Sequence, residues 1–413
     1  MTADKYVCNK CVLDKALSAL ILEEGEEHPC DYCGETPTDL RCLTINRLAQ
    51  HIYDNILREY SDVDSEMVSY DNEEGCYYSD TYTTLELLTD EVEFEADEMI
   101  IDDMVDALPN LTWCKKRFGP ADLTAALRAG WQVFVDLVKH HNRYLFDDHA
   151  NPAPDRNPFP PSEAFGVTYD ADEGVPPARI LDALGAIVPK ANLITTIDAG
   201  TVLFRARVHA TDEHPSTPAE LGPPPREKAY QSNRMSPAGI VMFYGAFDRE
   251  TAIAETFHRG REGAEEKVIS VAQFRCQKPL TVLDLTDLPS PPSFFVDREI
   301  RHGIRFLHMF EEDFVKPVAR DGMEHVEYVP TQIVTEYFRH RFRTGSGESL
   351  DGIVYRSSQN ERRACVFFFD SSSCGGETGF SRADPVLQLQ ESATERIGGE
   401  QLIKGSSSIP PHK

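Results

Sequence analysis

The chain has 413 residues, enough for two or three domains of ordinary size. Apolar residues make up 41% of it and aromatic residues 9%, a composition that can support a substantial hydrophobic core. The net charge of −28 repels nucleic-acid phosphates, so general nucleic-acid binding is not expected, and an acidic ligand would need a local basic pocket.

The sequence also indicates the cellular compartment of the protein. No segment approaches the roughly 18–20 consecutive apolar residues of a membrane span. The start, MTADKYVCNK, lacks the apolar core of a signal peptide. We therefore expect a cytoplasmic protein that does not bind membranes. In that reducing environment, closely spaced cysteines hold metal more often than they form disulfides.

Residues 1–42 are polar and contain two CxxC pairs, separated by eighteen residues. This spacing is typical of zinc ribbons, in which two turns place four thiolates in a tetrahedron. So polar a segment has too little core to fold without metal. We expect one structural zinc ion, bound by Cys8, Cys11, Cys30 and Cys33. The alternative is a set of redox-active or incidental cysteines.

Residues 43–147 are predicted to form an acidic helical domain. An apolar stripe predicts a helix that Thr44 is placed to cap, and its members are Ile45, Leu48, Ile52 and Ile56. Between Arg58 and Lys115 there is no Lys or Arg, which predicts helices with a strongly acidic outer face. A third helix is expected after Pro120, with Trp131 and Phe134 on its apolar side.

Residues 148–177 are rich in Pro and Asp and predict an interdomain linker. In residues 178–391, short apolar runs bounded by turn residues predict strands at Thr201–Val208, Ile240–Gly245, Val268–Phe274, Leu280–Asp284, Gly352–Tyr355 and Cys365–Phe369. A short helix is predicted before them at Arg179–Ile187, and helices are predicted between them at Arg249–Phe257, Asp297–Phe314 and Val329–Phe342. The expected class is α+β with mixed strand order, followed by a disordered tail, residues 392–413.

Three motifs in this second half contain chemically suggestive residues. LFRAR places Arg205 in a predicted strand. NRMSPAGIVMFYGAFDRETAIAET places Asn233 and Arg234 in a turn, Tyr244 at a strand end and Glu255 in a helix. DGIVYRSSQN places Ser357 where a strand ends. Taken singly, each of these residues has an ordinary structural interpretation, as a strand-edge arginine, a solvent-facing glutamate or a capping serine.

In this order, the motifs resemble the RES family, which is named for an Arg, a Glu and a Ser. The resemblance spans residues 200–370 and includes YVPTQIVTEYF. It implies a mixed α/β domain with a fold like ADP-ribosyltransferases, and a function as a bacterial toxin that degrades NAD. It also implies that the name-giving residues are Arg205, Glu255 and Ser357. In the ambiguous pairs Arg205/Arg207 and Ser357/Ser358, the earlier residue fits the family pattern. Asn233, Arg234 and Tyr244 would complete the NAD pocket. The first half is similar to the HEPN-related domain that precedes RES domains.

The chemistry fits these residue types. Guanidinium groups, such as those of Arg205 and Arg234, bind diphosphates well. Nicotinamide is a cationic leaving group that needs no general acid, and a carboxylate such as that of Glu255 stabilises the positive charge that develops on the ribose. Ser357 can hydrogen-bond a ribose hydroxyl or a phosphate. Either water or inorganic phosphate can accept the ADP-ribosyl group, so both a glycohydrolase and a phosphorylase stay open.

Two other functions are considered. Arg143 and His149 have the spacing of a HEPN ribonuclease pair, but Tyr144 follows the arginine where a polar residue is usual, and the acidic domain is poorly suited to bind RNA. The second alternative is a non-enzymatic interaction module with an inert RES domain, whose acidic faces would bind a basic partner such as an antitoxin or a defence protein.

Overall fold

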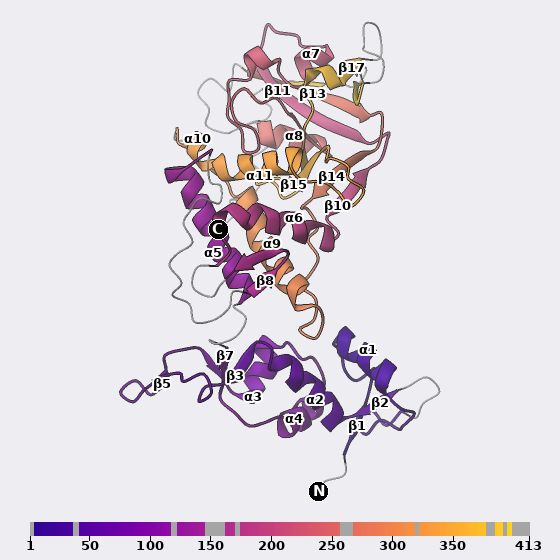
Figure 1. The fold of residues 1–413 in the computed structure, drawn as a ribbon. Helices are drawn as coiled ribbons and strands as arrows, with labels where there is room; N and C mark the ends of the chain where they lie inside the picture. The colour runs from indigo at the N-terminus through magenta and orange to yellow at the C-terminus, as the bar shows by residue number, and fades with distance from the viewer. Residues whose placement is uncertain are drawn as a thin grey trace. The chain divides into compact units, whose positions relative to one another are not determined.

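The computed structural model describes residues 4–35, 41–116, 122–144, 162–169, 174–256, 267–318, 322–376, 385–390 and 395–398 (Figure 1). It divides into two compact units. The N-terminal unit comprises Met1–Gly130, Asn151–Pro176 and Ser290–Phe306, and the C-terminal unit comprises Trp131–Ala150, Pro177–Pro289 and Leu307–Lys413. Among the described residues, no helix has both the length and the apolar composition needed to cross a bilayer.

The N-terminal unit begins with two short strands, β1 (Tyr6–Cys8) and β2 (Cys42–Thr44), which pair antiparallel. Between them in sequence, α1 (Lys15–Glu24) starts at Asp14, whose carboxylate accepts hydrogen bonds from two backbone N–H groups of the first turn. The helix predicted after Thr44 is confirmed as α2 (Ile45–Ile56), and the Thr44 hydroxyl accepts a hydrogen bond from the backbone N–H of Arg47. Its apolar stripe is buried in the unit's core.

The acidic region combines helices with small sheets. α3 (Thr84–Glu86) continues into the π-helical turn η1 (Leu87–Glu91), and α4 (Glu98–Ala107) follows. Leu87, Leu88, Ile100 and Met104 are buried and the acidic residues lie toward the surface, as the pattern predicted, whereas Leu85 and Met99 are exposed. Unpredicted strands form two more sheets, β3 (Tyr60–Asp62), β7 (Trp113–Lys115) and β6 (Thr81–Tyr82) in one, and β4 (Tyr70–Asp71) with β5 (Cys76–Tyr77) in the other. Strands of two or three residues are too short for periodicity to reveal.

A buried ion-pair cluster lies in the N-terminal unit. The Glu59 carboxylate contacts the guanidinium of Arg301, which is 1% exposed, as well as Arg298 at 3.2 Å and His302 at 3.4 Å. Burial would raise the pKa of Glu59, but these three groups outweigh it and lower that pKa to about 2. The cluster thereby ties the Ser290–Phe306 segment to the rest of its unit.

The predicted linker, residues 148–177, includes a hairpin that its composition did not indicate. Within it, β8 (Ser162–Ala164) pairs antiparallel with β9 (Val167–Tyr169). Phe165 and Gly166 between them have positive φ values of 53° and 71°, the backbone of a two-residue hairpin turn. Phe165, Val167 and Tyr169 are buried. The abundance of Pro and Asp nearby concealed this short alternation of buried and exposed residues.

The described residues of the C-terminal unit form a 10-stranded sheet. Nine of its strands follow the order β10-β14-β15-β16-β12-β11-β13-β18-β17, and the tenth, β19, pairs with β13. The strands are β10 (Ile194–Ile197), β11 (Val202–Ala210), β12 (Phe243–Ala246), β13 (Lys267–Cys276), β14 (Leu280–Asp284), β15 (Gly352–Arg356), β16 (Arg363–Phe367), β17 (Cys374–Gly376), β18 (Leu387–Leu389) and β19 (Glu395–Gly398). Two pairs, β14–β15 and β17–β18, are parallel and the others antiparallel. The predicted α+β class with mixed strand order is confirmed.

The described helices with residues in the C-terminal unit are α5 (Leu123–Asp136), which continues as η2 (Leu137–His141), α6 (Ile180–Lys190), α7 (Pro218–Leu221), α8 (Arg249–Thr256), α9 (Arg298–Val315), α10 (Glu324–Glu327) and α11 (Val329–His340), with short 3-10 turns at Pro177–Arg179, Arg226–Lys228 and Ser371–Ser373. α5 and α9 each begin in residues assigned to the N-terminal unit and end in residues assigned to the C-terminal unit. α8 packs on β11, β12, β13 and β16. The sheet's core contains three clustered rings, with the Phe243 centroid 5.3 Å from that of Phe274 and 6.1 Å from that of Phe367.

β19 lies within the tail that was predicted to be disordered, so that prediction is wrong for Glu395–Gly398. Its backbone pairs antiparallel with β13 from Val268 to Val271. An edge strand can be added through backbone hydrogen bonds alone, which do not require an apolar sequence.

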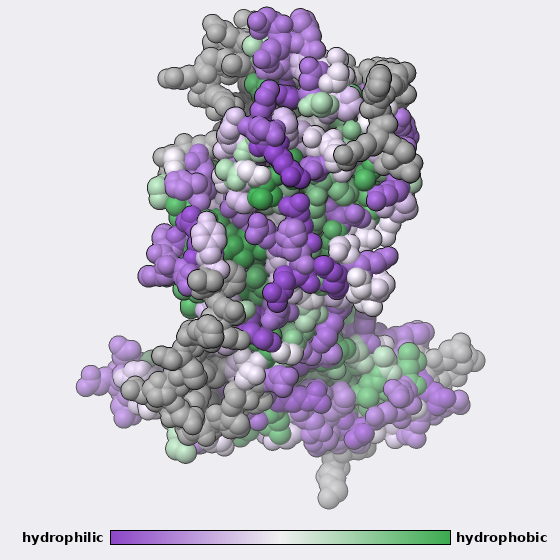
Figure 2. All heavy atoms as spheres, turned by 45° about the horizontal axis from the view of Figure 1, so that its top comes forward, coloured by the Kyte–Doolittle hydropathy of each residue, from purple (hydrophilic) through white to green (hydrophobic). Residues whose placement is uncertain are grey.

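The face of the molecule drawn in Figure 2 is largely hydrophilic, with smaller groups of apolar side chains between the polar ones, as expected from the net charge.

Candidate functional site

Four cysteine sulfurs converge in the N-terminal unit. The Sγ atoms of Cys8, Cys11, Cys30 and Cys33 all lie within 4.8 Å of one another, and all four cysteines are free thiols. The separations are 3.5 Å for Cys8–Cys11 and 3.8 Å for both Cys8–Cys33 and Cys11–Cys30. Four sulfurs at about 2.3 Å from a tetrahedral zinc ion would be about 3.8 Å apart. The cluster can therefore hold a metal ion.

The backbone around the sulfurs also suits thiolate ligands. Two backbone N–H groups hydrogen-bond the Cys8 sulfur, and three hydrogen-bond that of Cys30. Gly34 donates its N–H to the Cys30 carbonyl at 3.0 Å, with a φ of +69° that favours glycine. Cys42 pairs with Cys8 across β1 and β2, but its thiol donates to the His28 carbonyl at 3.0 Å, and burial raises its pKa to about 12. Cys42 is thus a neutral neighbour of the cluster.

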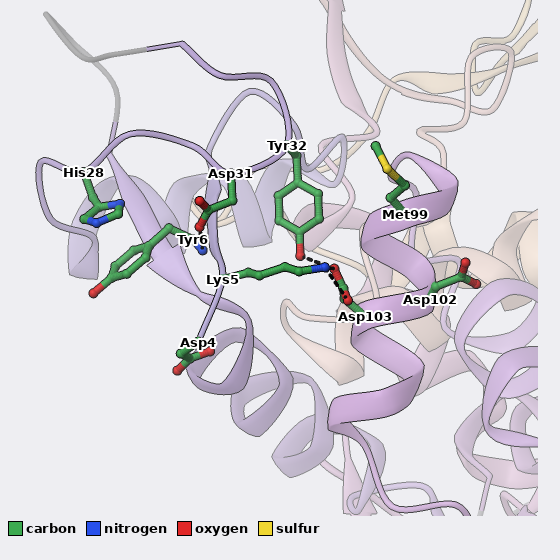
Figure 3. Close-up of a pocket in the computed structure, with 9 residues that line it drawn as sticks. All are labelled: Asp4, Lys5, Tyr6, His28, Asp31, Tyr32, Met99, Asp102 and Asp103. Carbon is green, nitrogen blue, oxygen red and sulfur yellow. Dashed lines mark hydrogen bonds and ion pairs between the residues drawn. The ribbon is translucent and has the colours of Figure 1, made fainter. Parts of the chain in front are cut away.

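An open pocket of about 800 Å³ lies beside the cysteine cluster, between β1, the second cysteine turn and α4 (Figure 3). Its lining residues are Asp4, Lys5, Tyr6, His28, Asp31, Tyr32, Met99, Asp102 and Asp103. The Lys5 ammonium pairs with Asp103 at 2.6 Å and lies 5.7 Å from the centre of the Tyr32 ring. With one lysine among four aspartates, this pocket offers a negative, partly aromatic wall to a cationic group.

In the C-terminal unit, the second and third motifs bring Glu255, Ser357 and Arg234 together. Glu255 lies in the last turn of α8, Ser357 follows β15 and is 1% exposed, and Arg234 lies in the turn before β12. Burial raises the pKa of Glu255, whereas a hydrogen bond from Ser357 and the positive charge of Arg234 act to lower it. The carboxylate is thus partly desolvated and flanked by one hydroxyl and one cation.

Arg234 is held by the chain that follows α9. Its Nη1 donates to the carbonyls of Phe314 at 3.0 Å and Lys316 at 2.7 Å, and the guanidinium lies 5.8 Å from the centre of the Tyr328 ring. Nε and Nη2 make no hydrogen bond to any residue that the structure describes. Half of the guanidinium is therefore available to an anion.

Tyr244 and Asn233 have different surroundings. The Tyr244 hydroxyl lies 2.9 Å from the Ser236 hydroxyl, and burial raises its pKa, so it stays a neutral phenol. The charge of Arg234 acts on it, which places Tyr244 in the same cluster. Asn233 is exposed, and its side-chain amide donates to the Gln231 carbonyl. The Asn233 backbone, rather than its side chain, shapes the turn by pairing with Ser236.

Arg205 lies in β11, where its guanidinium binds backbone carbonyls. Nε donates to Leu221 at 3.1 Å and to Gly222 at 3.2 Å, and Nη1 donates to the Tyr244 carbonyl. Burial lowers the pKa of Arg205 to about 10, which leaves it charged at neutral pH. Arg207 likewise donates to the Glu220 carbonyl. The arginines of LFRAR thus connect β11 to the end of α7 and to β12.

Comparison with known proteins gives the family. Residues 202–378 match the model of the RES domain, and residues 23–152 match that of HEPN/RES N-terminal domain 1. This chain contains a RES domain. Both matches confirm the resemblance stated from the motifs, and the RES family is generally associated with NAD-related toxin activity. No curated protein and no solved structure gives a significant match to the chain.

Two features of the RES domain were not anticipated from its sequence. Asn360, at the end of DGIVYRSSQN, donates to the Thr251 hydroxyl at 2.9 Å and so supports the start of the helix that carries Glu255. Thr331 and Gln332, in YVPTQ, hydrogen-bond the turn of Arg234. The sequence did contain a signal, because each of these polar residues lies inside a recognised motif, but their partners are distant in sequence.

The structure describes only one residue of the candidate ribonuclease pair. Arg143 follows η2, and His149 lies outside the described residues. At the end of that helix, Lys139 pairs with Glu327 at 2.6 Å. The pair therefore remains a sequence-based alternative.

Proposed function

We propose that this RES domain cleaves the glycosidic bond between nicotinamide and ribose in NAD. The proposal rests on one observation, that Glu255, Ser357 and Arg234 lie together in one partly desolvated cluster. These three residues come from two separate motifs. A carboxylate whose pKa is raised by burial and that lies beside a cation is typical of functional sites. The family match over residues 202–378 supports the choice of NAD as substrate.

In the proposed reaction, the bond between ribose C1′ and the nicotinamide nitrogen breaks. The bonding electron pair leaves with nicotinamide, which becomes neutral, and positive charge develops on the ribose. The ionised Glu255 stabilises that charge. Water or inorganic phosphate then forms the new bond at C1′ and, when water is the acceptor, a proton is released.

Binding and catalysis are assigned to different groups. The free half of the Arg234 guanidinium binds the diphosphate. Ser357 orients the Glu255 carboxylate, and Tyr244 offers a neutral phenol to a ring or a phosphate. Arg205 acts as a positioning residue because its hydrogen bonds go to carbonyls at the end of α7 and of β12.

The test is incubation of the purified protein with NAD, with and without inorganic phosphate, followed by mass analysis of the products. Nicotinamide with ADP-ribose indicates a glycohydrolase, and nicotinamide with phosphorylated ADP-ribose indicates a phosphorylase. Unconsumed NAD in both reactions contradicts the proposal. We also expect activity in cells to be toxic, and a protein antitoxin to restrain it.

A second role is proposed for the N-terminal unit, namely docking of a basic protein partner on a scaffold held by zinc. The acidic lining of the pocket in Figure 3 supports it. Titration with a lysine-rich peptide should show binding that weakens with salt and with Asp102→Asn, while NAD turnover stays unchanged. Binding that is insensitive to both changes would contradict this role.

A further inference from the structure

The first turn of α11 contacts the turn that carries Arg234. The Gln332 side-chain amide donates to the Asn233 carbonyl and to the Ser232 hydroxyl, both at 2.8 Å. The Thr331 hydroxyl donates to the Arg234 carbonyl. Both side chains are buried, with 6% of Thr331 and 7% of Gln332 exposed.

These contacts complement those on the Arg234 side chain. The carbonyls of Phe314 and Lys316 accept from one edge of the guanidinium, whereas α11 holds the main chain of the same residue. Thr335, one turn further along α11, donates to the Thr331 carbonyl at 2.7 Å. The backbone and the side chain of Arg234 are therefore fixed by different elements, which leaves the other edge of its guanidinium oriented.

We infer that Thr331 and Gln332 are positioning residues that hold Arg234 in its anion-binding orientation before the substrate arrives. The inference rests on the proposed function, because it assigns these residues to the NAD site. If the two residues only filled the core, apolar side chains of similar shape could replace them without a penalty. Their hydrogen bonds instead end on the carbonyls of residues 233 and 234. A site that is already ordered loses less conformational freedom on binding.

A matched pair of substitutions at Thr331 tests the inference. Thr331→Val removes the hydroxyl and keeps the branched shape, whereas Thr331→Ser keeps the hydroxyl. Loss of one buried hydrogen bond should raise the KM for NAD about tenfold in Thr331→Val and change kcat less than about threefold. Thr331→Ser should stay within about twofold of the wild type on both parameters. A Thr331→Val protein with wild-type KM would overturn the inference.

A second measurement separates this inference from the proposed function. If the wild type consumes no NAD, the proposed function fails, and hydrogen exchange of the amides in residues 233–236 still tests the positioning. Those amides should exchange faster in Thr331→Val than in Thr331→Ser or the wild type. Equal protection in all three proteins would refute the positioning role. Should Thr331→Val fail to fold, Gln332→Met offers the same comparison against the wild type at the neighbouring hydrogen bond.

Discussion

Glu255→Gln should slow NAD turnover strongly and leave NAD binding intact. Glutamine keeps the size of the side chain and a partner for Ser357, but it removes the negative charge. Two unit charges about 5 Å apart interact by about 3 kcal/mol at an effective dielectric constant of about 20. If that interaction exists only in the transition state, its loss slows nicotinamide release by roughly two decades. Ground-state affinity should change little because the diphosphate is assigned to Arg234.

The assay measures nicotinamide release for turnover and calorimetric titration for binding. Glu250→Gln is the matched control, since Glu250 is an exposed glutamate on the same helix. Because catalysis needs the ionised carboxylate and burial raises the pKa of Glu255, wild-type turnover should fall with decreasing pH at a pH above the roughly 4.3 of an ordinary glutamate. A Glu255→Gln protein that releases nicotinamide at the wild-type rate would refute the mechanism.

Four further outcomes are expected. Protein purified without added metal should contain about one zinc ion per chain by elemental analysis, and a folded, metal-free protein would contradict the assignment of Cys8, Cys11, Cys30 and Cys33. Glu59→Gln should lower the free energy of unfolding by about 3–5 kcal/mol in urea titrations, because it leaves the buried Arg301 without its counter-charge; an unchanged midpoint would argue against the cluster. In the wild type, the stability contributed by Glu59 should be lost as the pH falls from its ordinary pKa of about 4.3 toward the folded value of about 2, since its folded pKa is depressed. Arg143→Ala should leave any toxicity to cells intact, and loss of toxicity together with RNA cleavage by the wild type would favour the ribonuclease instead.

Much of the local structure follows from the sequence alone. The apolar stripe after Thr44 became α2 with its predicted cap, and the apolar runs of the second half became strands of the large sheet. These features depend on the periodicity of neighbouring residues, which any sequence displays directly. The CxxC spacing likewise identified four cysteines that converge, because each short turn already places two sulfurs close together.

Other features depended on tertiary structure. The Ser290–Phe306 segment belongs to the N-terminal unit through the Glu59 cluster, and a hairpin lies where a linker was predicted. Arg205 was expected to bind phosphate, yet its guanidinium binds carbonyls at the end of α7 and of Tyr244. Thr331 binds a turn almost a hundred residues earlier. Composition and spacing identify which groups can hydrogen-bond or ionise, but the partner each one meets is set by three-dimensional distance, which only the folded chain determines.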